Sequence, residues 1–268
     1  MIKHRDILAF INEIAPYPDA EVWDPTGPTL GWLDDQTTGV VISLDLTSDA
    51  YRLALANNYN LIITHHPFIF SPFKQFVADN FEQSLLLDLA GQRISVMSCH
   101  TNLDVAVEGV ATSFVEASLN PESYYSDIKI LIPHEMKSEV GHGRIVMLKE
   151  EQRLSYLLKQ VENNLKTTVQ VNLDQNSTVQ KIVFTPGSFD ESWIPQLEQQ
   201  AVDLLITGEI KHHVGVMLKE RGIAMFAAGH GASEQTVIPL LQTKLSKKFS
   251  KINFVENPGI TYNQLRSE

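Results

Sequence analysis

Short runs of β-branched and apolar residues alternate with longer amphipathic stretches along most of this 268-residue chain. Runs such as VVIS and LIIT have the length and composition of buried strands, and the stretches between them have a helical period. Such alternation predicts an α/β fold, in which helices cover mainly parallel or mixed sheets. The predicted strands span 38–45, 61–65, 93–99, 144–149, 167–173, 180–185, 203–207, 223–228 and 251–256, and the predicted helices span 4–15, 48–58, 80–91, 106–119, 151–165, 191–201, 211–221 and 232–249.

A turn-rich stretch from Asn120 to Gly143 interrupts this alternation. It contains NPESYYSD and PHEMKSEVGHG, whose composition predicts a connection rather than a strand or a helix. A chain of this length is also long enough for two domains of roughly 100–200 residues each. We therefore expect two similar α/β domains at 1–125 and 126–268, with the last helix and strand able to pack back on the first domain.

Charge and hydropathy exclude several classes of function. The chain has 21 Lys and Arg against 32 Asp and Glu, and the formal net charge is −11. A protein that binds a nucleic-acid backbone needs a basic face, so we expect no nucleic-acid partner. No apolar run approaches the roughly 18 residues that span a bilayer, and the first residues lack the pattern of a signal peptide. With Cys99 as the single cysteine, we expect a cytoplasmic protein without an internal disulfide or a membrane partner.

Five segments share one pattern, in which an apolar strand is followed directly by His, Asp, Gly or Glu. In open α/β sheets, ligands bind beyond the carboxyl ends of the strands. Polar residues from distant parts of the sequence can therefore meet in one site. The segments are LIITHHP (61–67), VMSCHTNLD (96–104), VFTPG (183–187), LLITGEIKHH (204–213) and MFAAGHGASE (225–234).

Three of these segments carry potential metal ligands. His65 and His66 are adjacent at a strand end, Asp104 follows another strand, and His230 and Glu234 lie four residues apart where a helix is predicted to begin. Each piece alone also fits a surface histidine or a carboxylate at a helix start. Together they supply three nitrogens and two carboxylates, enough for two divalent ions with open positions for water. Mixed nitrogen and oxygen ligands suit zinc, iron, manganese or cobalt.

The motifs HHP (65–67), SCHTNLD (98–104), TGEIKHH (207–213) and GHGASE (229–234) resemble, in order and spacing, those of the Ngg-interacting-factor-three-like family. Bacterial members are also called GTP cyclohydrolase type 2 homologues. The resemblance extends from WDPTGPTLG at 23–31 to ENPG at 256–259. It implies a two-metal site in the cleft between the two domains. It also implies a toroidal homohexamer, because the chain has the length of the family's short form.

The resemblance assigns roles to individual residues. The implied metal ligands are His65, His66, Asp104, His230 and Glu234, with Glu234 as the bridge between the ions.

Other implied roles lie beside the metals. His100 and His213 are expected to act in catalysis, and Glu209 is expected to contact the substrate. Arg144, in a motif with Gly141 and Gly143, is expected to pair with phosphate.

The chain departs from the family pattern at two places. Pro25, Thr26 and Pro28 stand where the family has a segment closer to WDN followed by an apolar-Gly-Leu stretch, and Val146 replaces a glycine. These departures bear on the choice of substrate and leave the metal ligands unchanged.

The function expected from the ligand set and the resemblance is that of a dinuclear metal-dependent hydrolase, similar to GTP cyclohydrolase. Two divalent ions (zinc, iron or manganese) would make hydroxide available at neutral pH. The hydroxide would attack the purine ring of a small-molecule substrate such as GTP, and His100 or His213 would relay the proton. Hydrolysis of another phosphoester, nucleotide or cyclic amide is an alternative. A non-catalytic metal-binding regulatory scaffold is a second alternative.

Overall fold

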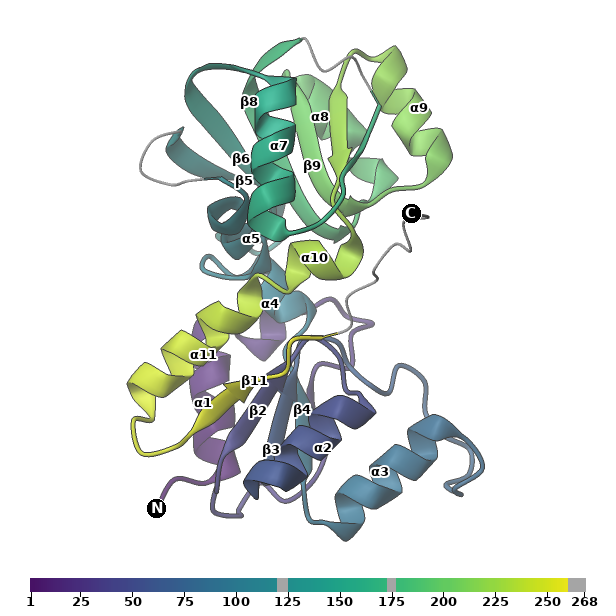
Figure 1. Cartoon of the computed structure of the whole chain (residues 1–268), viewed down its shortest axis with the longest axis vertical. Helices are drawn as coiled ribbons and strands as arrows, with labels where there is room; N and C mark the ends of the chain where they lie inside the picture. Colours follow the sequence, from purple (N-terminus) through teal and green to yellow (C-terminus); the bar gives the residue numbers. More distant parts are fainter. Residues whose placement is uncertain (120–124, 173–176, 260–268) are drawn as a thin grey trace, which may run out of the picture. The chain divides into compact units, whose positions relative to one another are not determined.

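The computed structural model describes residues 1–119, 125–172 and 177–259. The chain divides into two compact units, each a mixed sheet with helices on both faces (Figure 1). The first unit comprises Met1–Ala106 and Ile238–Gly259, and the second comprises Val107–Val237. The predicted α/β class is confirmed.

The first unit contains a five-stranded sheet in the order β1-β4-β3-β2-β11. All neighbouring pairs are parallel except β1 with β4. Its strands are β1 (Gly27–Leu30), β2 (Val40–Ser43), β3 (Leu61–Thr64), β4 (Ser95–Ser98) and β11 (Phe254–Glu256). Its helices are α1 (His4–Ile14), α2 (Ser48–Asn57), α3 (Phe81–Gly91), α4 (Thr101–Val105) and α11 (Val237–Lys248), with a short 3-10 helix, η1 (Tyr17–Asp19).

Strand side chains alternate between the two faces of this sheet, and both faces are buried. Val41, Ile62 and Val96 share one apolar cluster with residues of α2 and α3. On the opposite face α1 lies beside α11 (Figure 1). The ring centroids of Phe10, in α1, and Phe249, just after α11, are 5.8 Å apart. Helices on both faces explain why the central strands are continuous apolar runs.

The second unit contains a six-stranded sheet in the order β5-β6-β8-β9-β10-β7. Strands β8, β9 and β10 are parallel to one another, whereas β5, β6 and β7 join the sheet through antiparallel pairs. Its strands are β5 (Tyr125–His134), β6 (Lys137–Arg153), β7 (Gln170–Val171), β8 (Thr178–Ser188), β9 (Leu204–Glu209) and β10 (Ala224–Ala227). Its helices are α5 (Val110–Ser118), α7 (Leu154–Leu165), α8 (Ile194–Gln199), α9 (His212–Glu220) and α10 (His230–Glu234), and a 3-10 helix, η2 (Glu191–Trp193), precedes α8.

Two apolar clusters cover the two faces of this second sheet. Leu204 and Ile206 point to the face covered by α5 and α7, and Leu205 points to the face covered by α8 and α9. The sheet therefore fixes the positions of the residues that follow its parallel strands.

The prediction of a connection at 120–143 is wrong for the residues that the structure describes. Strands β5 and β6 form an antiparallel hairpin there, while residues 120–124 lie outside the described residues. The turn-forming residues have places within the strands. Pro133 lies in β5 at the edge of the sheet, where a missing N–H is tolerated. Gly141 has φ +155°, and a Cβ there would lie 2.1 Å from the carbonyl oxygen of Ile132.

Two predicted helices differ from those in the structure. The helix predicted at 106–119 corresponds to α5, which begins later, at Val110, because Ala106 has an extended ψ of 145°. The helix predicted at 232–249 is α10 followed by α11.

The division between the units follows Ala106, whereas the sequence placed the first domain at 1–125. Strand β1 was not predicted, because Gly27 and Pro28 are unusual in strands.

No described helix combines the length and the apolar character that crossing a bilayer requires.

Candidate functional site

Three parallel strands of the first unit end at the same edge of the sheet, and each is followed by a polar residue. Asp45 comes after β2, His65 and His66 come directly after β3, and His100 comes after β4. Backbone bonds fix the pair after β3, since His65 N–H donates to the Ser43 carbonyl and His66 N–H donates to the Leu44 carbonyl. The strand-end pattern thus gathers these side chains as predicted for open α/β sheets.

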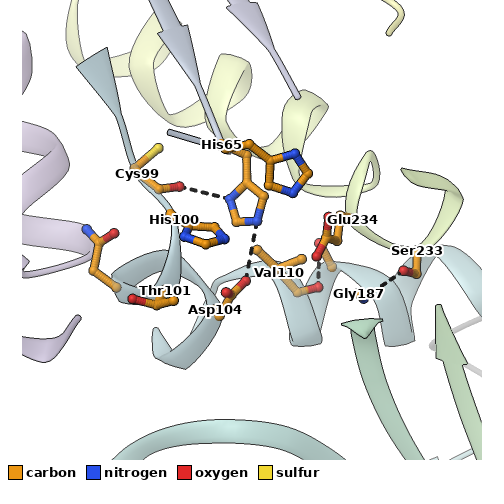
Figure 2. Close-up of polar contacts among 12 residues, drawn as sticks. His65, Cys99, His100, Thr101, Asp104, Val110, Gly187, Ser233 and Glu234 are labelled. Carbon is orange, nitrogen blue, oxygen red and sulfur yellow. Dashed lines mark hydrogen bonds and ion pairs between the residues drawn. The ribbon is translucent and has the colours of Figure 1, made fainter. Parts of the chain in front are cut away.

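His65 is held in one tautomer. Its ring is buried, and Nδ1 lies 2.8 Å from the carbonyl oxygen of Cys99 (Figure 2). A carbonyl only accepts hydrogen bonds, so Nδ1 carries a proton, and in the neutral ring Nε2 is the atom with the free lone pair. Nε2 lies 3.5 Å from Oδ1 of Asp104, which extends from α4 (Figure 2).

The two other histidines of this edge are oriented by carboxylates. Nδ1 of His66 lies 2.8 Å from Oδ1 of Asp45, and Nδ1 of His100 lies 3.1 Å from Oδ1 of Asp24. Thr101 fixes Asp24 in turn, because its backbone N–H donates to Oδ2 at 2.9 Å and its hydroxyl donates to the same oxygen. Burial alone would raise the pKa of Asp24, but the hydrogen bonds from His100 and Thr101 outweigh burial and lower it. Asp24 is therefore a carboxylate at neutral pH.

These three histidines form a compact group. One potential ligand atom from each of His65, His66 and His100 lies within 4.8 Å of the others. Each ring has Nδ1 bonded to an oxygen, which is the arrangement of metal-binding histidines, whose other nitrogen is oriented by a carbonyl or carboxylate.

His65 and the nearby Asp104 are spaced as two ligands of one divalent cation would be. Two donors that each lie about 2.1 Å from one tetrahedral cation are about 3.4 Å apart. The Nε2 to Oδ1 distance of 3.5 Å between His65 and Asp104 agrees with that separation. We therefore assign this edge of the first unit as a candidate metal-binding group.

The second unit has its own cluster at the carboxyl ends of β9 and β10. His230 begins α10, and its Nε2 lies 3.0 Å from Oε2 of Glu234, one helical turn later. Its Nδ1 lies 3.2 Å from Oε1 of Glu209, the last residue of β9. The structure thus brings together three residues that the sequence singled out.

Hydrogen bonding and charge from the two carboxylates change the protonation of His230. The hydrogen bond that His230 donates to the Glu234 carboxylate is the main cause, and despite partial burial the pKa of His230 rises to about 9. A metal ion binds the neutral ring, so a proton and a cation compete for the same nitrogen.

Two glycines let the backbone approach the side chains of Ser233 and Glu234 closely. A Cβ at Gly187, which follows the apolar part of β8 with φ +66°, would lie 2.3 Å from Oε1 of Glu234. The N–H of Gly187 donates to Oγ of Ser233 at 2.9 Å (Figure 2). A Cβ at Gly208 would lie 2.5 Å from the same Oγ. Close backbone approach therefore fixes the position of α10 and of the Glu234 carboxylate.

Two further predicted residues have partners of their own. His213 is exposed on α9, with Nε2 2.7 Å from Oε2 of Glu191. Arg144 is 2% exposed, and Nη1 donates to the carbonyls of Gly141 at 2.7 Å and Gly143 at 2.9 Å. The guanidinium thus holds the two glycines of its own motif.

Several residues that hold the candidate ligands were not predicted from the sequence. Asp45 follows β2 in VVISLD, which repeats the strand-end pattern and could have been found by it. Asp24 lies in the WDPTG segment, which was noted as a motif without a role. Gly187 and Ser233 lie within quoted segments, but only the fold shows that one donates to the other.

Comparison with known proteins identifies the relatives of this chain. The model of the family described as Duf34/NIF3 (NGG1p interacting factor 3) matches residues 2–261. A Lactococcus lactis protein named GTP cyclohydrolase 1 type 2 homolog is 32% identical over 91% of this chain and 91% of its own length. A Helicobacter pylori protein named GTP cyclohydrolase 1 type 2 is 26% identical over 94% of this chain and 95% of its own length.

Solved structures share the fold. A hypothetical protein of Staphylococcus aureus superposes with a TM-score of 0.86 at 24% identity, over 95% of this chain and 96% of that one. A Bacillus cereus protein related to NIF3 superposes with a TM-score of 0.88 at 18% identity, over 99% of both chains. Because the family model covers nearly the whole chain and the predicted resemblance is confirmed, this chain belongs to the Duf34/NIF3 family.

Proposed function

We propose that this chain is a metal-dependent hydrolase that opens the purine ring of GTP. The observation that carries the proposal is that His65 and His66 each bond Nδ1 to a carbonyl or carboxylate oxygen, with a ring nitrogen of His100 within 4.8 Å of both. Such second contacts orient metal ligands and raise their basicity. The names of the Lactococcus lactis and Helicobacter pylori relatives support the choice of GTP.

His65, His66, Asp104, His230 and Glu234 are the proposed ligands, and they would hold two divalent ions. The family match at residues 2–261 includes all five. When bound, the ions supply Lewis acidity, which polarises the bond to be broken and lowers the pKa of water.

His100 is the proposed proton carrier. Its Nδ1 bond to Asp24 leaves Nε2 to accept a proton from water and return it to the leaving nitrogen. The hydrogen bonds that Asp24 accepts lower its pKa, so Asp24 stays anionic. Its charge stabilises the imidazolium that forms when His100 takes up a proton. His213, whose Nε2 is paired with Glu191, is the second candidate for this role.

Glu209 and Arg144 are the proposed substrate contacts. Glu209 ends β9 beside His230, where its carboxylate can accept a hydrogen bond from an amino group of the substrate. Arg144 donates to Oγ1 of Thr112 as well as to its two glycine carbonyls. Its burial lowers its pKa to about 10, so it remains a cation at pH 7. Its pairing with phosphate stays a prediction.

Formate release tests the proposal. Hydrolytic opening of the imidazole ring at C8 releases formate, which is quantified while GTP is incubated with protein loaded with zinc, iron(II) or manganese. We expect formate release that is lost in His65→Ala and retained in the exposed control Asp49→Asn. Absence of formate with all three ions would overturn the GTP version.

A panel of phosphoesters, nucleotides and cyclic amides separates the alternatives. Hydrolysis of one of these compounds without activity on GTP would indicate a different hydrolase. Binding of the ions without hydrolysis of any compound would indicate a metal-binding scaffold. The predicted homohexamer is tested separately by light scattering of the purified protein.

A further inference from the structure

Two large aromatic side chains of the first unit are exposed beside His100. Trp23 is 63% exposed and Phe70 is 58% exposed. The ring centroid of Trp23 lies 6.1 Å from that of His100, at an interplanar angle of 74°. The ring centroid of Phe70 lies 6.0 Å from that of His100, at 86°. Both rings therefore contact the same imidazole edge-on and keep most of their own surface in solvent.

Single exposed aromatic residues are common on protein surfaces. These two differ because they share a neighbour, and that neighbour belongs to the group of three histidines. They also come from segments far apart in the sequence. Trp23 precedes Asp24, which orients His100, and Phe70 follows the His65-His66-Pro67 segment.

Backbone hydrogen bonds hold the segment that carries Trp23 in place. Near Trp23, the Asp24 N–H donates to the Glu21 carbonyl at 2.9 Å, and Glu21 N–H donates to Oγ1 of Thr101 at 2.9 Å. The exposed ring of Trp23 is thus attached to backbone that is fixed by hydrogen bonds.

Phe70 lies at the start of a longer irregular segment, and the side chain of Gln83 forms hydrogen bonds with two backbone groups of that segment. The Gln83 side chain accepts from Val77 N–H at 3.0 Å and donates to the Gln75 carbonyl at 3.2 Å. Phe68, two residues before Phe70, has its ring centroid 6.4 Å from that of Phe81.

We propose that Trp23 and Phe70 form a binding surface for a planar nitrogen-containing aromatic ring, such as a purine, and present that ring to His100. Aromatic side chains stack on the π-face of any base, and they offer little to a sugar phosphate alone. This inference deepens the proposed function, on which the role of the presented ring rests, and it adds the residues that select the substrate class.

Calorimetric titration with two ligands tests the inference. GMP and ribose 5-phosphate differ only in the base, so the pair isolates the contribution of the ring. Trp23→Leu and Phe70→Leu remove one aromatic each from the metal-loaded protein. Phe76→Leu is the matched control, because Phe76 is 47% exposed in the same segment and its ring contacts Phe73.

We expect Trp23→Leu and Phe70→Leu each to weaken GMP binding by about fivefold to a hundredfold, the range for loss of one stacking contact. Binding of ribose 5-phosphate and the metal content stay at the parent level, and Phe76→Leu binds GMP as the parent does. The inference is overturned if the parent does not bind GMP or if both variants bind GMP as tightly as the parent. It is also overturned if the variants lose affinity for GMP and for ribose 5-phosphate by the same factor.

The outcomes also separate this inference from the hydrolase proposal. A protein that binds GMP through Trp23 and Phe70 but releases no formate retains the binding surface and loses the proposed activity. A protein that releases formate while both variants bind GMP normally retains the activity and loses the binding surface.

Discussion

Replacement of Gly187 by alanine displaces the Glu234 carboxylate without altering any proposed ligand. The new Cβ would lie 2.3 Å from Oε1 and 3.3 Å from Cδ of Glu234. An ordinary contact begins near 3.4 Å, so Oε1 must move by about 1 Å, well beyond the roughly 0.2 Å tolerance of a metal–ligand distance. The φ of +66° adds a second cost of about 1 kcal/mol for an L side chain in the left-handed region.

Gly222→Ala separates these two effects. Gly222 has φ +73°, and a Cβ there meets nothing within 4 Å. Both variants should lower the melting temperature by about 2–4 °C, as expected for about 1 kcal/mol in a domain of this size. Only Gly187→Ala should bind divalent metal more weakly, by about tenfold or more when measured by chelator competition. A folded Gly187→Ala protein with the metal affinity of Gly222→Ala would refute the role assigned to Glu234.

Three further predictions concern the first unit. Asp45→Asn removes the carboxylate that orients His66 and should lower metal affinity about 10- to 100-fold in the same competition assay; an affinity equal to that of the exposed control Asp49→Asn would contradict this. His4 is fully buried, and neither ring nitrogen has a hydrogen-bond partner among the described residues. His4→Leu should therefore stabilise the metal-free protein by about 1 kcal/mol, and a lower melting temperature would show otherwise. Burial, with a smaller contribution from Asp104, raises the pKa of the Cys99 thiol to about 12. A thiol reagent at pH 8 should modify Cys99 only after denaturation, and rapid reaction of the native protein would disprove its burial.

The order of most strands and helices could be predicted from the sequence because their periods are clear. Strands such as LIIT are buried on both faces, so they read as continuous apolar runs. The hairpin of β5 and β6 could not be predicted in this way, since Pro133 and Gly141 indicate turns wherever they occur. Only the pairing of the strands shows that Pro133 lies at the edge of the sheet, where a missing N–H is tolerated. It also shows that the carbonyl oxygen of Ile132 leaves no space for a side chain at Gly141.

The strand-end pattern predicted which side chains gather at the ends of the strands, and the fold added how they are held. His65, His66 and His100 were identified from the strands that precede them. Asp24 was not assigned a role, because it lies 76 positions from His100 and no local period connects the two. Arg144 was expected to meet phosphate, and the contacts with its own glycine carbonyls follow from backbone conformations at Gly141 and Gly143 that the sequence does not specify.

Metal content per chain, determined by elemental analysis of the purified protein, tests the central claim most directly. The proposed centre predicts close to two equivalents of divalent metal in the parent. It also predicts a clear loss in both His65→Ala and Glu234→Ala, which remove one ligand from each unit. Little or no metal in the parent after incubation with zinc, iron(II) or manganese would contradict the account. Full metal content in Glu234→Ala would also contradict it.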